Sequence, residues 1–521
     1  MISNRWFSLM SRLFAAVVVS AMVVMGGVHA NAARPASSSS NTLTIGWNED
    51  SSTMDPTGVI SNYNIYVYVN IYDQLLRVNN NGRTLDKDLA TSWKITNGGK
   101  TYTFHLRKNV KFSNGQKLKA SDVVFCLKRA ALPSSNFSFL LPKFKTITAP
   151  NNSTVVLTLT QPWAPLLSDL ALYATAIYPE SYFKKVGAKG LANKPIGTGP
   201  YELKTWKKGQ YLLLTKNPHY WASKKFPMKQ IEFEVIPNDQ TRLLKVESGQ
   251  LDVDNVLPTT LIPQAQSSSG VKVQINKSTD VIYVTLNDKL SQFADAKVRQ
   301  AINHAIDRKA LVKAVLRGYG TPANSFIPKG ALYWEPTSKL PVPSHNLKLA
   351  KKLLKQSKHK KGFSMTFEVS AGDQEYTEIA TILQSELKPL GIKLQLKNVD
   401  PTTLQTEQQA DHFHMLATNW TNDIPDPDEL TSFAVDSSLS SHTFFTWYSD
   451  KKLNQLSEQG ERTTSASKRQ KIYYQIQSRW AQDTPYYALY YEPFINAVSS
   501  RVKGFAENPL GYFVLQGVKK S

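Results

Sequence analysis

The chain has 521 residues, of which 41% are hydrophobic and 20% charged, and its formal net charge is +22. Because hydrophobic cores stop growing at roughly 250–300 residues, this length predicts two or three lobes. The composition excludes a disordered chain and a bundle of membrane helices, and one cysteine cannot form an internal disulfide.

The first 32 residues are predicted to be a secretory signal peptide. Arg5 and Arg12 form a basic start, residues 13–25 an apolar core, and small residues offer cleavage after Ala30 or Ala32. This core is shorter than the ~20 residues that span a bilayer, which makes an uncleaved membrane anchor the weaker alternative. No cysteine lies near the cleavage site. We therefore expect an exported protein without a lipoprotein anchor, located in the cell envelope, at the cell surface or outside the cell.

Residues 33–41 are a serine-rich segment of low complexity, predicted to be a disordered linker. The chain that remains after signal removal is still strongly basic, and this charge favours anionic partners such as cell-wall polymers. Nucleic-acid binding is not expected. The lysines are scattered, and the sequence has no basic helix, zinc-ligand spacing or glycine-aromatic RNA motif.

Regular structure is predicted to begin with a strand of alternating apolar residues over 42–47. A turn follows, and then a helix over 62–76 that is rich in tyrosine and isoleucine. Residues 93–107 alternate with period two around the glycine-rich turn at 97–99, which predicts a hairpin.

Helices and strands alternate through the rest of the chain. Ser121 and Asp122 are predicted to cap a helix that runs to residue 131, with Cys126 as a buried core residue. Further helices are predicted at 298–306, 376–390 and 468–480, and strands at 391–396 and 485–491. This alternation predicts α/β units, and no internal repeat is present.

One stretch departs from the basic character of the chain. Asp423, Asp426, Asp428 and Glu429 place four carboxylates within seven residues, shortly after Trp420. Two prolines remove backbone donors and fix φ, which predicts that residues 419–427 form a rigid loop and not a helix or a central strand. Such a loop can hold a metal cation or an ammonium group, although the spacing and glycine of an EF-hand are absent. Asp426 and Asp428, beside prolines, are expected to stabilise turns.

Four motifs between residues 89 and 130 carry a family resemblance. They are Ala90-Thr91-Ser92-Trp93, Tyr102-Thr103-Phe104-His105-Leu106-Arg107, Val110-Lys111-Phe112-Ser113-Asn114-Gly115 and Ala120-Ser121-Asp122-Val123. Together they resemble the signature of the family 5 extracellular solute-binding proteins, the peptide-binding subunits of ABC importers and their relatives. The resemblance continues over nearly the whole mature chain, for example at Gly197-Thr198-Gly199-Pro200-Tyr201.

The resemblance implies a fold: α/β, two-lobed and periplasmic-binding-protein-like, with an inserted subdomain and two crossing hinge segments near 280–287 and 488–494. Hinge closure would enclose the ligand and present a closed shape to a membrane permease. The implied division of the chain is lobe I at 42–68, 186–283 and 490–521, an inserted subdomain of that lobe at 69–185, and lobe II at 284–489.

The resemblance also implies a ligand site. In peptide-binding members, the aspartate of a Trp-x-x-Asp element holds the α-ammonium of the ligand, and Trp420-Thr421-Asn422-Asp423 is similar to that element. This assigns the ammonium to Asp423. Ile424 stands where the family often has an aromatic residue.

Trp420 is also a candidate wall of the side-chain pockets, because aromatic faces tolerate varied partners. Trp47, Trp447 and Tyr448 are further candidates, and each of them is equally compatible with a place in the core. His412 and His414 have the spacing of metal ligands, but no third ligand is evident and we interpret them as strand residues.

The expected activity is therefore binding and not catalysis: the protein would capture oligopeptides and deliver them to the permease of an ABC importer. It is expected to act as a monomer without cofactor or metal. Catalytic signatures such as Gly-x-Ser-x-Gly or His-Glu-x-x-His are absent from the sequence. The alternatives are an adhesin or structural protein of the cell surface that binds anionic polymers, a secreted peptidase, and a binder of another solute such as a nickel chelate, haem or an oligosaccharide.

Overall fold

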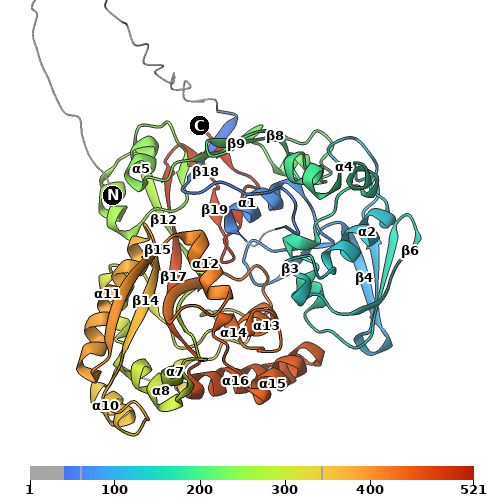
Figure 1. Ribbon diagram of the computed structural model, residues 1–521. Coiled ribbons are helices and arrows are strands. Elements are labelled where there is room, and N and C mark those ends of the chain that lie inside the picture. The colour runs from blue at the N-terminus through green and yellow to red at the C-terminus, as the bar shows by residue number, and fades with distance from the viewer. Residues whose placement is uncertain (1–39, 59–60, 342–343) are drawn as a thin grey trace, which may run out of the picture. The chain divides into compact units, whose positions relative to one another are not determined.

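A mixed sheet of eleven strands runs through the part of the chain that the computed structural model describes, residues 40–58, 61–341 and 344–521 (Figure 1). Ten strands lie in the order β15-β14-β16-β12-β17-β11-β1-β10-β9-β8, and β13 pairs with β17. Their bounds are β1 Thr42–Trp47, β8 Tyr201–Lys207, β9 Tyr211–Lys216, β10 Gln230–Val235, β11 Val253–Asp254, β12 Val271–Leu286, β13 Thr321–Pro322, β14 Ser364–Ser370, β15 Lys393–Val399, β16 Met415–Trp420 and β17 Tyr486–Ser499. The predicted α/β class is confirmed.

The buried hydrophobic side chains divide into four clusters that follow the sequence. Two clusters draw on residues 43–271 and 495–518, which we call the first lobe, and two draw on residues 281–491, which we call the second lobe. Ile424 is an exception, because it is a second-lobe residue that packs in a first-lobe cluster. The acidic stretch therefore lies where the two lobes meet.

Strands β12 and β17 pass from one lobe to the other as an antiparallel pair. Val271 and Ala497 pack in the first lobe, whereas Ile282 and Leu489 pack in the second. Their register shifts between the pairs Asn276–Phe494 and Asp280–Glu492, where the strands cross between the cores. The predicted hinge segments 280–287 and 488–494 fall in these two strands, and the proposed lobe boundaries stay predictions.

A separate four-stranded sheet in the order β4-β5-β7-β6 lies in the segment predicted to be the inserted subdomain (Figure 1). Its strands are β4 Ala90–Thr96, β5 Thr101–Leu106, β6 Phe144–Asn151 and β7 Thr154–Leu159, so the predicted hairpin is confirmed. Helix α2 (Ala120–Ala130) begins before the predicted cap, because Asp122 accepts a hydrogen bond from the backbone N–H of Lys119 at 2.9 Å. Cys126 is buried, as predicted.

Helices cover both lobes. Those of the first lobe, besides α2, are α1 Asn62–Ile71, α3 Leu166–Asp169, α4 Glu180–Asn193, α5 Asp239–Glu247 and α6 Ile262–Ser267. Those of the second are α7 Ser291–Ala294, α8 Ala296–Ala305, α9 Arg308–Ala314, α10 Leu347–Lys355, α11 Gln374–Leu387, α12 Pro401–Gln409, α13 Asp428–Ala434, α14 His442–Phe445, α15 Lys451–Arg462 and α16 Ala466–Asp483. Short pairs join β2 Leu76–Val78 to β3 Leu85–Lys87, β18 Val502–Lys503 to β21 Lys519–Lys520, and β19 Ala506–Glu507 to β20 Phe513–Val514.

Most predicted elements are found near their predicted bounds. Helix α1 ends at Ile71 and not near residue 76, because the chain turns there into β2. The predicted signal peptide and all but the last two residues of the predicted linker lie outside the described residues. Among the described helices, none combines the length and the apolar character needed to cross a bilayer.

The end of α1 is held by a glycine turn, and this leads to a prediction. Gly199 donates its N–H to the carbonyl of Ile71 at 2.9 Å, and a Cβ on Gly199 would lie 2.5 Å from the Ile71 carbonyl carbon. Because the contact is with backbone, Gly199→Ala must displace α1 or the turn. We expect it to lower the free energy of unfolding by about 1–3 kcal/mol, measured by urea denaturation.

The control is Gly270→Ala, because a Cβ there would meet no atom within 4 Å. We expect that variant to unfold at the wild-type urea concentration. Equal stability of the two variants would contradict the assigned contact.

Candidate functional site

The acidic stretch begins inside a central strand. Asn419 and Trp420 are the last residues of β16, which lies between β14 and β12, and Trp420 is opposite Val281. The prediction of a loop over 419–427 is therefore wrong for these two residues. The prolines that exclude strand pairing come only at 425 and 427, so they leave the ladder intact up to Trp420.

The four residues of the Trp-x-x-Asp element lie together and are buried, with exposed fractions of 9% for Trp420, 8% for Thr421, 1% for Asn422 and 3% for Asp423. The Trp420 ring packs on Phe433 with centroids 4.2 Å apart.

Glu429, at the start of α13, organises the backbone of this element. It accepts hydrogen bonds from Trp420 Nε1 at 3.2 Å, from the Asp423 N–H at 2.9 Å and from the Ile424 N–H at 3.1 Å. The two backbone donors fix the chain at Asp423, and the third holds the Trp420 ring.

The Asp423 carboxyl is buried beside another acid. Burial raises its pKa to about 7, and the hydrogen-bonded contact with Glu429 opposes part of that rise. Burial, followed by the charge of Asp423, also raises the pKa of Glu429 well above its ordinary value. Removing a carboxylate from water without a cation is costly, so a ligand cation beside Asp423 would relieve this cost.

The remaining two carboxylates differ from each other. Asp426 forms a bidentate ion pair with Arg469, at 2.7 and 2.9 Å, and also accepts the Asp428 N–H, as expected for a turn-stabilising side chain. Both carboxyl oxygens of Asp428 lack a hydrogen-bond partner among the described residues. The turn role predicted for Asp428 is therefore not seen in its side chain.

The largest of four described cavities, of about 690 Å³, is lined by both lobes. Asn48 and Tyr66 line it from the first lobe, Glu375 and Asn419 from the second, and Asp280 from the crossing strand β12. We call it the interlobe cavity. Its volume falls in the range of about 300–1,000 Å³ that is typical of ligand sites.

The interlobe cavity and Asp423 are connected by one short segment of the chain. Asn419 lines the cavity at the end of β16, and the chain continues from it through Trp420 to Asp423. Asp423 itself does not line any of the four cavities, although its neighbours Asn422 and Ile424 line one of about 30 Å³.

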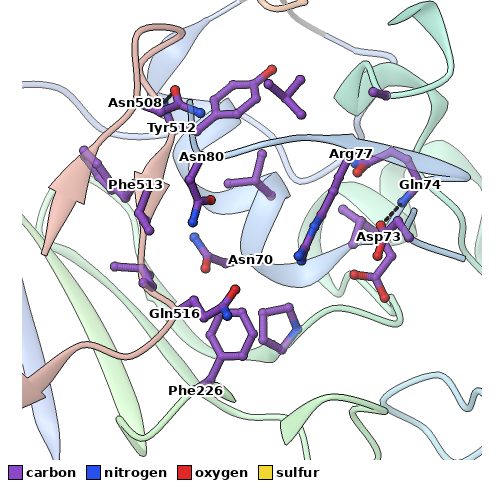
Figure 2. A pocket seen from close by; sticks show the side chains of 18 of the residues that line it. Asn70, Asp73, Gln74, Arg77, Asn80, Phe226, Asn508, Tyr512, Phe513 and Gln516 are labelled. Carbon is purple, nitrogen blue, oxygen red and sulfur yellow. Dashed lines mark hydrogen bonds between the residues drawn. The ribbon is translucent and has the colours of Figure 1, made fainter. Parts of the chain in front are cut away.

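A further pocket, of about 100 Å³, lies within the first lobe (Figure 2). Figure 2 shows Asn70, Arg77 and Asn80 with their polar ends directed towards the same space, and Tyr512 at its margin. Tyr512 also donates its hydroxyl to the Asp423 carbonyl at 2.5 Å. This pocket is smaller than a typical ligand site and is built from one lobe.

The other predicted wall residues lie elsewhere. Trp47 is fully buried in the first-lobe core, stacked on Phe233 at 4.6 Å. Trp447 lies under the ammonium of Lys289 at 3.7 Å, and the Tyr448 hydroxyl bonds to Asp483 at 3.1 Å. None of the three lines the cavities described above.

Several cavity residues were missed from the sequence: Asn255, Asp280, Arg317, Glu375 and Glu492. Asp280 and Glu492 carried a signal, because each is a charged residue at the end of an apolar strand segment. Only the fold brings the five residues together.

His412 and His414 precede β16 and are not strand residues, which corrects that interpretation. The His414 ring nitrogen contacts the Thr366 hydroxyl at 2.6 Å. Among the described residues, no three His, Cys, Asp or Glu side chains are grouped as metal ligands would be.

Comparison with known proteins gives a consistent result. Residues 84–441 match the family model described as "Bacterial extracellular solute-binding proteins, family 5 Middle". Among curated proteins, the probable D,D-dipeptide-binding periplasmic protein DdpA of Escherichia coli K12 is 29% identical, over 90% of this chain and 92% of that protein. Heme-binding protein A of Haemophilus influenzae is 25% identical, over 86% of each chain.

Among solved structures, the periplasmic binding protein DppA of Helicobacter pylori, in complex with the peptide STSA, superposes with a TM-score of 0.82. It is 26% identical, and the match covers 92% of this chain and 98% of that one. The structural neighbours are two-lobed periplasmic binding proteins, which confirms the predicted fold. These relatives are binding proteins and not enzymes, as the sequence predicted.

Proposed function

Because the chain belongs to the bacterial extracellular solute-binding proteins of family 5, we propose that it captures oligopeptides between its lobes and delivers them to the permease of an ABC importer. Proteins of this family are exported solute-binding components of such importers, found in the periplasm or at the cell surface. The observation that carries the peptide proposal is the buried carboxyl of Asp423 beside Trp420.

A peptide fits this position for electrostatic reasons. Its α-ammonium would supply the cation that the Asp423 carboxylate needs, through charge-assisted hydrogen bonds. Its backbone would continue along the end of β16, where main-chain groups can bind any sequence. The relatives named for dipeptides and crystallised with a peptide support the same ligand class.

Access to Asp423 requires the lobes to separate. Ile424 is packed in the first-lobe core, and Tyr512 of that lobe holds the Asp423 carbonyl. We propose that rotation about β12 and β17 opens this contact, and that closure then buries the ligand.

The function is tested on two samples. Native mass spectrometry of the protein as purified should show discrete bound peptides. Calorimetry of protein that has been unfolded, dialysed free of ligand and refolded should show tight binding of short peptides. Binding only of anionic polymers would favour an adhesin, and cleavage of the added peptides would favour a peptidase.

Binding should depend on pH in a defined direction. Burial raises the pKa of Asp423 to about 7, and a bound ammonium favours the ionised form. The affinity should therefore fall by up to about tenfold per unit as the pH drops below 7, with proton release on binding. It should fall again above about pH 8, where the peptide α-amino group loses its proton.

The groups that face Asp423 are Glu429, Tyr173 and Tyr512, and burial keeps both tyrosines neutral in this range by raising their pKa values. Calorimetry in buffers of different ionisation enthalpy checks the prediction. In Asp423→Asn the fall of affinity below pH 7 should be lost, and its persistence would assign it to other acids.

A further inference from the structure

Resting on the proposed function, we propose that the interlobe cavity binds a second positive charge. The preferred ligands would then be peptides that carry a lysine or arginine side chain in addition to their amino terminus. The cavity is an acidic space in a basic protein: six carboxylates line it together with one guanidinium, from Arg317. The carboxylates are Asp239, Asp280, Asp373, Glu375, Glu378 and Glu492.

Two of these acids already have assigned partners. Asp239 forms an ion pair with Arg242 at 2.5 Å, and Asp373 caps α11 by accepting the Tyr376 N–H at 2.9 Å. Arg317, at the exposed margin, donates to the Val315 carbonyl at 3.1 Å. Of the six acids, Asp239 is therefore paired with a cation, whereas Asp373 has a neutral donor and adds to the negative charge of the others.

Asp280, Glu375 and Glu492 form the centre of this negative charge. Asp280 and Glu492 are directly opposite on β12 and β17, a position where like charges repel. Asp280 accepts from Asn419 Nδ2 at 3.1 Å and Glu375 from the Tyr490 hydroxyl at 2.7 Å, both neutral donors.

Of the three carboxyls, Glu492 is the one whose negative charge is opposed most strongly by its surroundings. Its pKa is raised well above the ordinary value by burial and by the charges of Glu375 and Asp280. Burial likewise raises the pKa values of Asp280 and Glu375, and no cation is among the groups that shift them. A ligand cation beside these acids would compensate the negative charge that they share.

An independent feature of the first lobe points to a ligand with donors. Asn255 lines the cavity and is 4% exposed, yet neither its amide oxygen nor its amide nitrogen has a hydrogen-bond partner among the described residues. An ammonium or guanidinium group can donate to that oxygen. The rings of Tyr63 and Tyr66 line the same cavity and can accept a cation on their faces.

The position of the cavity fits one extended ligand. Asn419 lines the cavity and Asp423 follows four residues later along the same segment. A peptide with its α-ammonium at Asp423 and its backbone along the end of β16 would place a later side chain in the cavity. The two acidic groups would thus hold two different charges of the same ligand.

The test uses refolded, ligand-free protein and calorimetry with three tetrapeptides that differ at one internal residue: lysine, Nε-acetyl-lysine or glutamate. The lysine peptide should bind at least about tenfold more tightly than the acetyl-lysine peptide, and the glutamate peptide most weakly. Glu375→Gln/Glu492→Gln should abolish the lysine preference while the acetyl-lysine peptide binds within about twofold of wild type. The matched control is Glu407→Gln, on helix α12, which does not line the interlobe cavity, and this variant should keep the preference.

Folding of the double variant is checked by thermal unfolding, and its Tm should not fall, because the change removes uncompensated charge. Equal binding of the three peptides by wild type would overturn the inference and leave the proposed function standing. Binding of none of them would overturn the proposed function. Tight binding of spermidine alone would support the cation site and reject the peptide as its carrier.

Discussion

Asp423→Asn is expected to weaken the binding of peptides with a free amino terminus by about 2–5 kcal/mol, roughly thirtyfold to several thousandfold in Kd. Asparagine keeps the size of the side chain but removes the charge that would pair with the ammonium. The loss is large because the position is buried, at 3% exposure, so the ligand ammonium would be left in the cleft without water. Isothermal titration calorimetry with one tetrapeptide measures the effect.

Acetylation of the peptide amino terminus should reproduce the loss in wild type and add little in the variant. Glu458→Gln is the control for a change of net charge, because Glu458 is exposed and forms an ion pair with Arg462 of its own helix. Equal binding of free and acetylated peptides by wild type would refute the role of Asp423.

The fold could be predicted well because its signals are local. Alternating apolar residues mark β1 and the β4–β5 hairpin, and helical periodicity marks α8 and α16. The end of α1 was misplaced, because the chain turns into β2 after Ile71 and the Ile71 carbonyl bonds to Gly199, far away in the sequence. Local pattern carries no information about such contacts.

The site could be predicted only in part. A cluster of acids after a tryptophan in a basic chain marked this stretch, and the family resemblance singled out Asp423 within it. The structure shows Asp423 buried beside Glu429, and its role in ligand binding stays a prediction. An aromatic residue in the sequence can belong to a pocket wall or to the hydrophobic core, and its type does not distinguish the two. Trp47 was a candidate for the pocket wall, and the structure places it in the core. The acids of the interlobe cavity come from α5, β12, the start of α11 and β17, which only the tertiary fold places together.

The acidic stretch depends on one arginine, and its removal should have the largest effect on stability. Arg469, on α16, donates to both Asp426 oxygens and to the Gly460 carbonyl, and both charged partners are 4% exposed. Arg469→Met leaves Asp426 as an uncompensated buried charge. We expect a loss of about 3–5 kcal/mol in the free energy of unfolding, measured by urea denaturation at pH 8.

Arg469→Met/Asp426→Leu should recover stability, because an apolar pair of similar volume leaves no buried charge. A double variant no more stable than Arg469→Met would show that the ion pair is not the source of the loss. Because Asp426 lies three residues from Asp423, Arg469→Met should also weaken peptide binding. The double variant shows whether this effect is separate from stability. If it regains stability but still binds peptides weakly, the ion pair positions the ammonium site as well as stabilising the fold.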